Sequence, residues 1–182
     1  MPVWLLAAAL AGGATVDYLR TATEKIDNIQ SDRLPAGSRV ELSPLELSAW
    51  AQSQVPDGVR DAKVRIDSSG VATGSAMVDL ARVFQSQKLQ GGRMFSMLLR
   101  GERPVSVTAR VRSGGGSATV EVTRVEVSGL EIDGATLDLL IQYVLLPLYP
   151  NAAVGRPFEL GHRIERLDVE QTSVGVVIGP ER

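Results

Sequence analysis

The sequence predicts an α+β fold, in which a long curved antiparallel sheet wraps around an apolar helix and one or two further helices precede it. Three observations support this prediction. Helical patterns occupy the N-terminal third, and alternating apolar and polar residues, typical of strands, recur from about residue 62 to residue 128. A segment that is apolar on nearly every face, residues 134–150, then follows. A surface helix keeps one polar side, so this segment has to be covered.

The first 30 residues predict an apolar segment followed by an amphipathic helix. Met1–Ala14, MPVWLLAAALAGGA, has the length and the small-residue end of a signal-peptide core, although no Lys or Arg precedes it. We expect export to the cell envelope, periplasmic or extracytoplasmic, or tethering at the N-terminus. The alternative is the buried start of a helix. From Thr15 to about Gln30, a helical stripe is formed by Val16, Leu19, Ile26 and Ile29. We expect residues 31–182 to form a single α+β domain.

A short strand and a second helix are expected next. Arg39–Leu42 has the pattern of a strand. Ser43-Pro44-Leu45-Glu46 combines an N-cap serine, a proline at the first helical position and a glutamate at the third. This arrangement predicts a helix that runs to about Gln54 and ends before Pro56-Asp57-Gly58.

The central region changes to a period of two, which predicts hairpins. Ala62–Ile66 and Val71–Val78 flank a turn at residues 67–70. Alternating valines and alanines at residues 105–111 and 118–122 flank Ser113-Gly114-Gly115-Gly116, which we interpret as a hairpin loop. Val125 and Val127 are out of phase with Val122, so we expect a β-bulge near Thr123-Arg124. A closing hairpin is predicted with arms at about residues 163–169 and 173–178.

Residues 134–150, GATLDLLIQYVLLPLYP, pose the main question about function. At about 1.5 Å per residue the segment is short for a bilayer span of about 30 Å. It therefore packs as an ordinary core helix, or it forms a wall against something apolar that the protein carries. Strands rich in Val and Ala already supply a core, and their small side chains leave room for acyl chains. Each buried methylene contributes about 0.8 kcal/mol.

A second candidate feature is the segment of residues 88–103, KLQGGRMFSMLLRGER. Basic residues bracket an apolar cluster, and residues 79–112 as a whole carry seven basic and two acidic side chains. Such a segment suits contact with an anionic membrane surface, where each Lys or Arg contributes roughly 1 kcal/mol. The alternative is an amphipathic helix whose apolar face packs on the sheet.

The inventory of chemical groups argues against an enzyme. The chain has no cysteine and one histidine, His162, and the triple glycine lacks the Lys-Ser/Thr of a phosphate-binding loop. Acidic pairs such as Asp57/Asp61 and Glu165/Asp168 are better explained by turns and solvation. The formal net charge of −2 gives no reason to expect nucleic-acid binding. We expect no catalytic residue, no metal and no cofactor.

The layout of the chain resembles that of a known family. A Ser-Pro-Leu-Glu-Leu-Ser helix start is followed by hairpins and then by VSGLEIDGATLDLLIQYVLLPLYPNAAVGRPFEL. This order is similar to that of the LmeA-like phospholipid-binding proteins of bacterial envelopes, relatives of the tubular lipid-binding superfamily. The similarity covers roughly residues 39–178 and is carried by Ser128-Gly129-Leu130, the apolar segment and Gly175-Val176-Val177-Ile178. The chain departs from envelope lipoproteins in lacking a lipobox cysteine.

The resemblance and the residues together give one functional prediction, which is the non-enzymatic binding of a phospholipid or another acyl-chain ligand in a hydrophobic groove. Transfer of that ligand, storage and sensing stay open as its purpose. The partners would be that lipid and a membrane surface. The alternative is a tethered structural or protein-interaction domain without a ligand. The expected ligand-binding residues are Leu137, Leu140, Ile141, Val144, Leu145 and Leu148 on the helix and Val107, Ala109, Val120 and Val122 on the sheet. The expected membrane-contact residues are Arg93, Met94, Phe95, Met97, Arg100 and Arg103.

Overall fold

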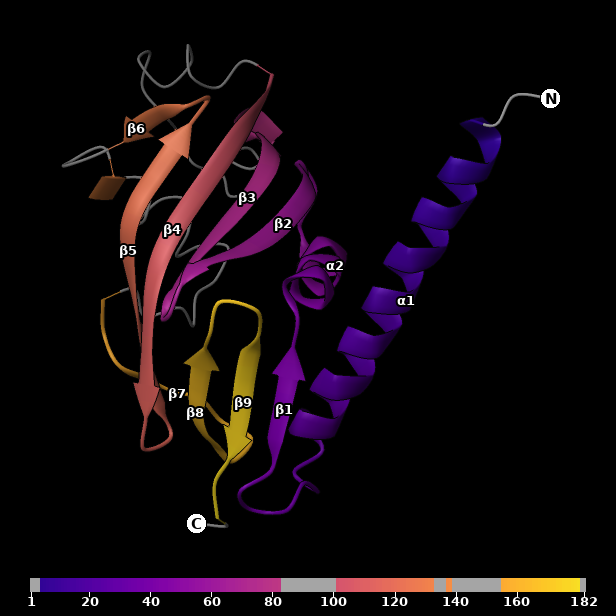
Figure 1. Ribbon diagram of the computed structural model, residues 1–182. Coiled ribbons are helices and arrows are strands. Elements are labelled where there is room, and N and C mark those ends of the chain that lie inside the picture. Colours follow the sequence, from indigo (N-terminus) through magenta and orange to yellow (C-terminus); the bar gives the residue numbers. More distant parts are fainter. Residues whose placement is uncertain (1–3, 83–100, 133–136, 139–154, 181–182) are drawn as a thin grey trace.

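The chain folds into two antiparallel sheets with two helices at the N-terminus, so the predicted α+β class is confirmed (Figure 1). The computed structural model describes residues 4–82, 101–132, 137–138 and 155–180. Its helices are α1 (Trp4–Gln30) and α2 (Pro44–Gln54). Its strands are β1 (Arg39–Leu42), β2 (Val59–Ser68), β3 (Val71–Asp79), β4 (Glu102–Gly114), β5 (Ser117–Val127), β6 (Leu130–Ile132), β7 (Phe158–Glu159), β8 (Ile164–Val169) and β9 (Val174–Ile178).

The strands divide between two sheets, which differs from the single long sheet expected. The larger sheet has the order β2-β3-β4-β5-β6, with β7 paired to β5, and the smaller sheet has the order β1-β9-β8. Neither sheet is strongly curled. The apolar segment that the curved sheet was expected to wrap lies outside the described residues, apart from 137 and 138. The physical reason for the split is that β1 pairs with β9, near the other end of the chain, instead of joining the central hairpins.

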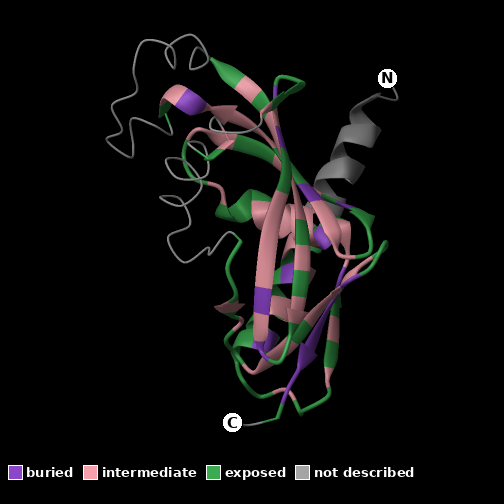
Figure 2. Ribbon diagram, turned by 90° about the vertical axis from the view of Figure 1, so that its left-hand side faces the viewer, coloured by how far each residue is buried: buried purple, intermediate pink, exposed green. Residues whose placement is uncertain are grey.

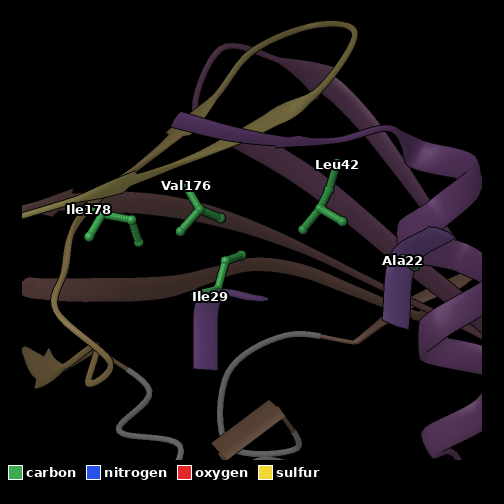
Figure 3. Packing of buried hydrophobic residues seen from close by; sticks show 5 residues of the cluster. All are labelled: Ala22, Ile29, Leu42, Val176 and Ile178. Atoms are coloured by element: carbon green, nitrogen blue, oxygen red, sulfur yellow. The ribbon is translucent and has the colours of Figure 1, made fainter. Parts of the chain in front are cut away.

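Helix α1 supplies one side of a compact core against the smaller sheet. It is a single helix from Trp4 to Gln30, so the predicted helix at 15–30 begins earlier than expected. From residue 17 onward its buried residues are Ala22 and Ile29; Ile29 belongs to the predicted apolar stripe, and Ala22 adds to it. Figure 3 shows these two side chains with their partners from β1 and β9, which are Leu42, Val176 and Ile178. None of the helices among the described residues is long and apolar enough to cross a bilayer.

Helix α2 begins as the sequence predicts. The Ser43 side chain accepts from the backbone N–H of Glu46, and the Glu46 carboxylate accepts from the N–H of Ser43 at 2.7 Å. This capping box satisfies two N–H groups that an α-helix leaves without partners. The helix also protects the edge of the larger sheet. Ser48 Oγ accepts from Val64 N–H at 2.8 Å, and the Gln52 side chain accepts from Ala62 N–H, both on the edge strand β2.

Hydrogen bonds along β8 join the two sheets. Ser113, at the end of β4, bonds both the N–H and the carbonyl of Leu167 through its hydroxyl, at 2.7 and 2.9 Å. The N–H groups of Gly70 and Gly116, in the two hairpin turns, donate to the carbonyls of Val169 and Glu165. The hairpin turns of the larger sheet are therefore hydrogen-bonded to β8, the edge strand of the smaller sheet. These bonds fix the position of the larger sheet relative to the core formed by α1 and the smaller sheet.

Gly175 leaves room for the Arg39 side chain, which lies over β9. A Cβ at this glycine would lie 2.5 Å from Arg39 Cζ, because the guanidinium lies across it and pairs with Glu41, Asp168 and Glu170. The hydrogen bonds that the guanidinium donates to these carboxylates, first to Glu41, raise the pKa of Arg39 above its ordinary value.

We expect Gly175→Ala to lower the thermal unfolding midpoint, because the new methyl group displaces the guanidinium from its three partners. Gly114→Ala is the matched control, since a Cβ there meets open space. In an Arg39→Ala background Gly175→Ala should have little effect. If Gly175→Ala lowers the unfolding midpoint by the same amount with and without Arg39, this explanation is wrong.

Candidate ligand-binding face

The register of the larger sheet places most of its aliphatic residues on one face. Residues paired across antiparallel strands share a face, and alternate residues along a strand point the same way. Ala109 pairs with Val122 and with Ala72, and Val107 pairs with Val125 and with Gly74. The face so defined is called the aliphatic face below. Its apolar members are Val59, Val64, Ile66, Ala72, Gly74, Ala76, Val78, Val105, Val107, Ala109, Val111, Ala118, Val120, Val122, Val125, Val127, Leu130 and Ile132. Arg103, opposite Val78, and Ser113, opposite Ala118, lie on the same face.

A β-bulge keeps this face continuous, as the sequence predicts. Thr108 pairs with Arg124 and Ala109 with Val122, so Thr123 is the extra residue on β5. Its hydroxyl donates to the Thr108 carbonyl. In a regular ladder the residues after Val122 would keep their phase, and Val125 and Val127 would point to the polar side. The bulge returns both to the aliphatic face, where they are 6% and 7% exposed.

The smallest side chains of the aliphatic face lie in line along β3. Ala72, Gly74 and Ala76 follow one another, with Val64 and Ile66 on β2 to one side and Val105 and Val107 on β4 to the other. We call this line the β3 furrow. From Ala72 to Ala76 it is about 14 Å long, and its flanking strands are ~10 Å apart. Gly74 is exposed, and a Cβ built there meets no atom within 4 Å.

The four sheet residues predicted to bind the ligand all lie on the aliphatic face. Val107, Ala109, Val120 and Val122 are half-buried, and Figure 2 shows β4 and β5 mainly in this intermediate class. Of the predicted helix residues, the described part of the chain includes only Leu137, which is half-buried. Leu140, Ile141, Val144, Leu145 and Leu148 lie outside the described residues. So do Arg93, Met94, Phe95, Met97 and Arg100 of the membrane-contact set, whereas Arg103 is half-buried in β4.

The furrow residues of β3 were missed by sequence reasoning. The alternation assigns Val71–Val78 to a strand, but it gives no reason to prefer the alanines to the valines. A glycine within a strand is the available signal, because Gly weakens a strand and marks close approach of another group. Gly74 is such a residue, and its position opposite Val107 becomes visible only with the register.

The opposite face of the larger sheet is polar and ion-paired. Arg60 contacts the Glu102 carboxylate at 2.6 Å, and Arg112 contacts that of Glu121 at 3.2 Å. The hydrogen bonds that Arg60 donates to the Glu102 carboxylate lower the pKa of Glu102 and raise the pKa of Arg60. The hydrogen bond from the Thr73 hydroxyl lowers the pKa of Asp67. This face therefore meets water, and the aliphatic face is the one suited to an apolar ligand.

His162 lies in a strained turn before β8. It is half exposed at 46%, has φ of 43°, and is followed by Arg163 with φ of 56°. Its Nδ1 lies 3.7 Å from the Asp32 carboxylate. No cluster of three or more His, Cys, Asp or Glu side chains able to hold a metal occurs within the described ranges. The turn ties the end of β9 to the loop after α1, because Arg163 donates to the carbonyls of Asp32 and Gly179.

Comparison with protein-family models, curated proteins and solved structures finds no match to this chain.

Proposed function

We propose that the chain binds a phospholipid or another acyl-chain ligand, without catalysis, on the aliphatic face of its larger sheet. The observation that supports this most directly is the β3 furrow, a line of minimal side chains between two rows of valine and isoleucine that is open at Gly74. A width set by three neighbouring strands accepts a single methylene chain and disfavours a bulky ring system. Ten methylenes in the furrow would contribute roughly 8 kcal/mol before the costs of association.

The segment of residues 134–150 would complete the site as its second wall. Its apolar residues would close over the furrow as a helix, so that the acyl chains lie between Leu140, Ile141 or Leu145 and the valines of β4 and β5. The polar headgroup would remain at the mouth. The basic and apolar residues between 93 and 103 would contact the bilayer from which the lipid is taken. We place the protein at the cell envelope, exported or tethered through its N-terminal segment.

The alternative function is a protein-interaction domain without a ligand. The observation that favours it is Leu130, which is 68% exposed on β6, the last strand of the larger sheet. An edge strand with an exposed apolar residue is a template for the addition of a partner strand. The two functions differ in one observable: a lipid-binding protein is purified with a bound lipid, and an interaction domain is purified without one.

Native mass spectrometry of protein purified gently from an envelope fraction tests the proposal. We expect one phospholipid per chain, released by organic solvent and identified in the extract. An apo mass that stays unchanged after incubation with phospholipid vesicles would contradict lipid binding and favour the interaction domain.

A further inference from the structure

A transverse row of polar residues crosses the polar face of the larger sheet. Lys63 pairs with Ser75, Ser75 with Ser106, and Ser106 with Glu126. These four side chains therefore stand side by side on successive strands, with an ammonium group at one end, a carboxylate at the other and two hydroxyls between. They line a shallow trough of about 380 Å³. Its remaining wall is formed by Asp61, whose carboxylate pairs with Arg60, and by Ala76, Met77, Pro104, Val105 and Gly129.

Neither charge at the ends of this trough has a close partner: the one ion pair of Glu126 among the described residues, with Arg124, is 3.5 Å long. Both contacts of the Glu126 carboxylate, from Ser106 Oγ and from Arg124, are 3.5 Å long, which is beyond a good hydrogen bond. The Lys63 ammonium group has no ion pair or hydrogen bond among the described residues. Elsewhere on this face opposite charges meet directly, as Arg60 meets Glu102. In this row two serines separate them and form an open floor.

We propose that this trough binds a short zwitterion, with its anionic group on Lys63 and its ammonium group on Glu126. Three strand spacings put the Cα atoms of Lys63 and Glu126 ~14 Å apart. A charged contact of about 2.8 Å at each end leaves up to roughly 8 Å for the ligand. An extended peptide of two or three residues has this length at about 3.5 Å per residue. Met77 and Pro104 pack beside its backbone, and Ser75 and Ser106 offer hydroxyls to its amides.

Triglycine is the probe for this site, followed by amide chemical shifts of the isotope-labelled full chain. We expect shifts that saturate and that centre on Ser75 and Ser106. Lys63→Gln and Glu126→Gln should each weaken binding at least about tenfold. Both side chains stand on the solvent side of the sheet, so the fold should survive. Arg65→Gln, on the same strand and face as Lys63, is the matched control and should leave binding unchanged.

Blocked probes assign the two ends. N-acetyltriglycine lacks the ammonium group, so it should bind the wild type as weakly as triglycine binds Glu126→Gln. Triglycine amide lacks the carboxylate, so it should bind the wild type as weakly as triglycine binds Lys63→Gln. Glycerophosphoethanolamine carries the same pair of charges from a lipid headgroup, and the tighter of the two probes identifies the natural source. Absence of saturable shifts with both probes at millimolar concentration would overturn the site. Lipid capture by the opposite face is measured separately, so either proposal can fail alone.

Discussion

Replacement of Gly74 by leucine is expected to abolish lipid capture while leaving the protein at least as stable as wild type. The new side chain occupies the β3 furrow between Val64 and Val107, where a Cβ meets no neighbour. Removing glycine from a strand interior favours the folded state, so loss of binding is not accompanied by loss of fold. The measurement is phospholipid occupancy by native mass spectrometry, with thermal unfolding on the same samples, and occupancy should fall at least about tenfold.

The matched control is Gly114→Leu, because that glycine also has free space for a Cβ but lies on the polar side at the end of β4. It should retain its lipid. Ala109→Leu, beside the furrow, should reduce occupancy as well, since it fills space without removing core. If both furrow variants keep wild-type occupancy, the ligand does not lie on the aliphatic face, and the assignment is wrong even if the protein binds lipid elsewhere.

Local signals in the sequence predicted local structure well. The capping box at Ser43 and Glu46 is encoded within four residues, and the structure has it with both hydrogen bonds. The bulge at Thr123 was visible as a change of phase between Val122 and Val125, because the period of a strand is two and a slip has one simple physical cause. Such features depend only on near neighbours along the chain.

Partner choice between distant strands was not predictable in the same way. Arg39–Leu42 is predicted as a strand and is a strand in the structure, but nothing within its sequence, RVEL, indicates that it pairs with Val174–Ile178. Loop-closure entropy rises only slowly with separation, so many pairings are open to a short strand. Burial decides the outcome. Leu42 and Val176 share a face, and α1 covers it with Ala22 and Ile29. A second sheet was therefore missed although its strands were identified.

The candidate sites show the same limit. Alternation alone predicts a shared face for four residues, because it fixes which way each side chain points within a hairpin. These residues are Val107, Ala109, Val120 and Val122. The furrow on β3 and the row from Lys63 to Glu126 each need the register of three or four strands. One-residue shifts in that register would separate their members, and no pattern within a single strand specifies it.

Replacement of Lys25 by methionine is expected to cost about 2–3 kcal/mol in free energy of unfolding near neutral pH, because it leaves a buried carboxylate without its counter-charge. Lys25 Nζ lies 2.6 Å from the carboxylate of Glu46, whose side chain is 8% exposed, and 2.7 Å from the Glu41 carbonyl oxygen. The contact joins α1 to the first turn of α2. Urea denaturation of the two proteins measures the difference. Arg20→Met is the control on the same helix, since its pairs with Asp17 and Glu24 are exposed.

The pH dependence of this variant separates a lost charge from lost packing. In the wild type burial acts to raise the pKa of Glu46, but hydrogen bonds from Lys25 and Ser43 outweigh it, so the pKa lies below its ordinary value of 4.5. The unfolded chain then binds more protons in acid, and this part of the stability is present above pH 4.5 and is lost as the pH falls through the folded-state pKa. Without Lys25, burial is opposed only by the hydrogen bonds with Ser43, so the pKa of Glu46 moves upward and the gain in stability with rising pH becomes smaller than in the wild type. Glu46→Gln keeps the capping box and removes the charge, so adding it to Lys25→Met should restore stability near pH 7 and remove this slope. A Lys25→Met protein whose stability follows the wild-type pH profile would show that the ion pair contributes only packing.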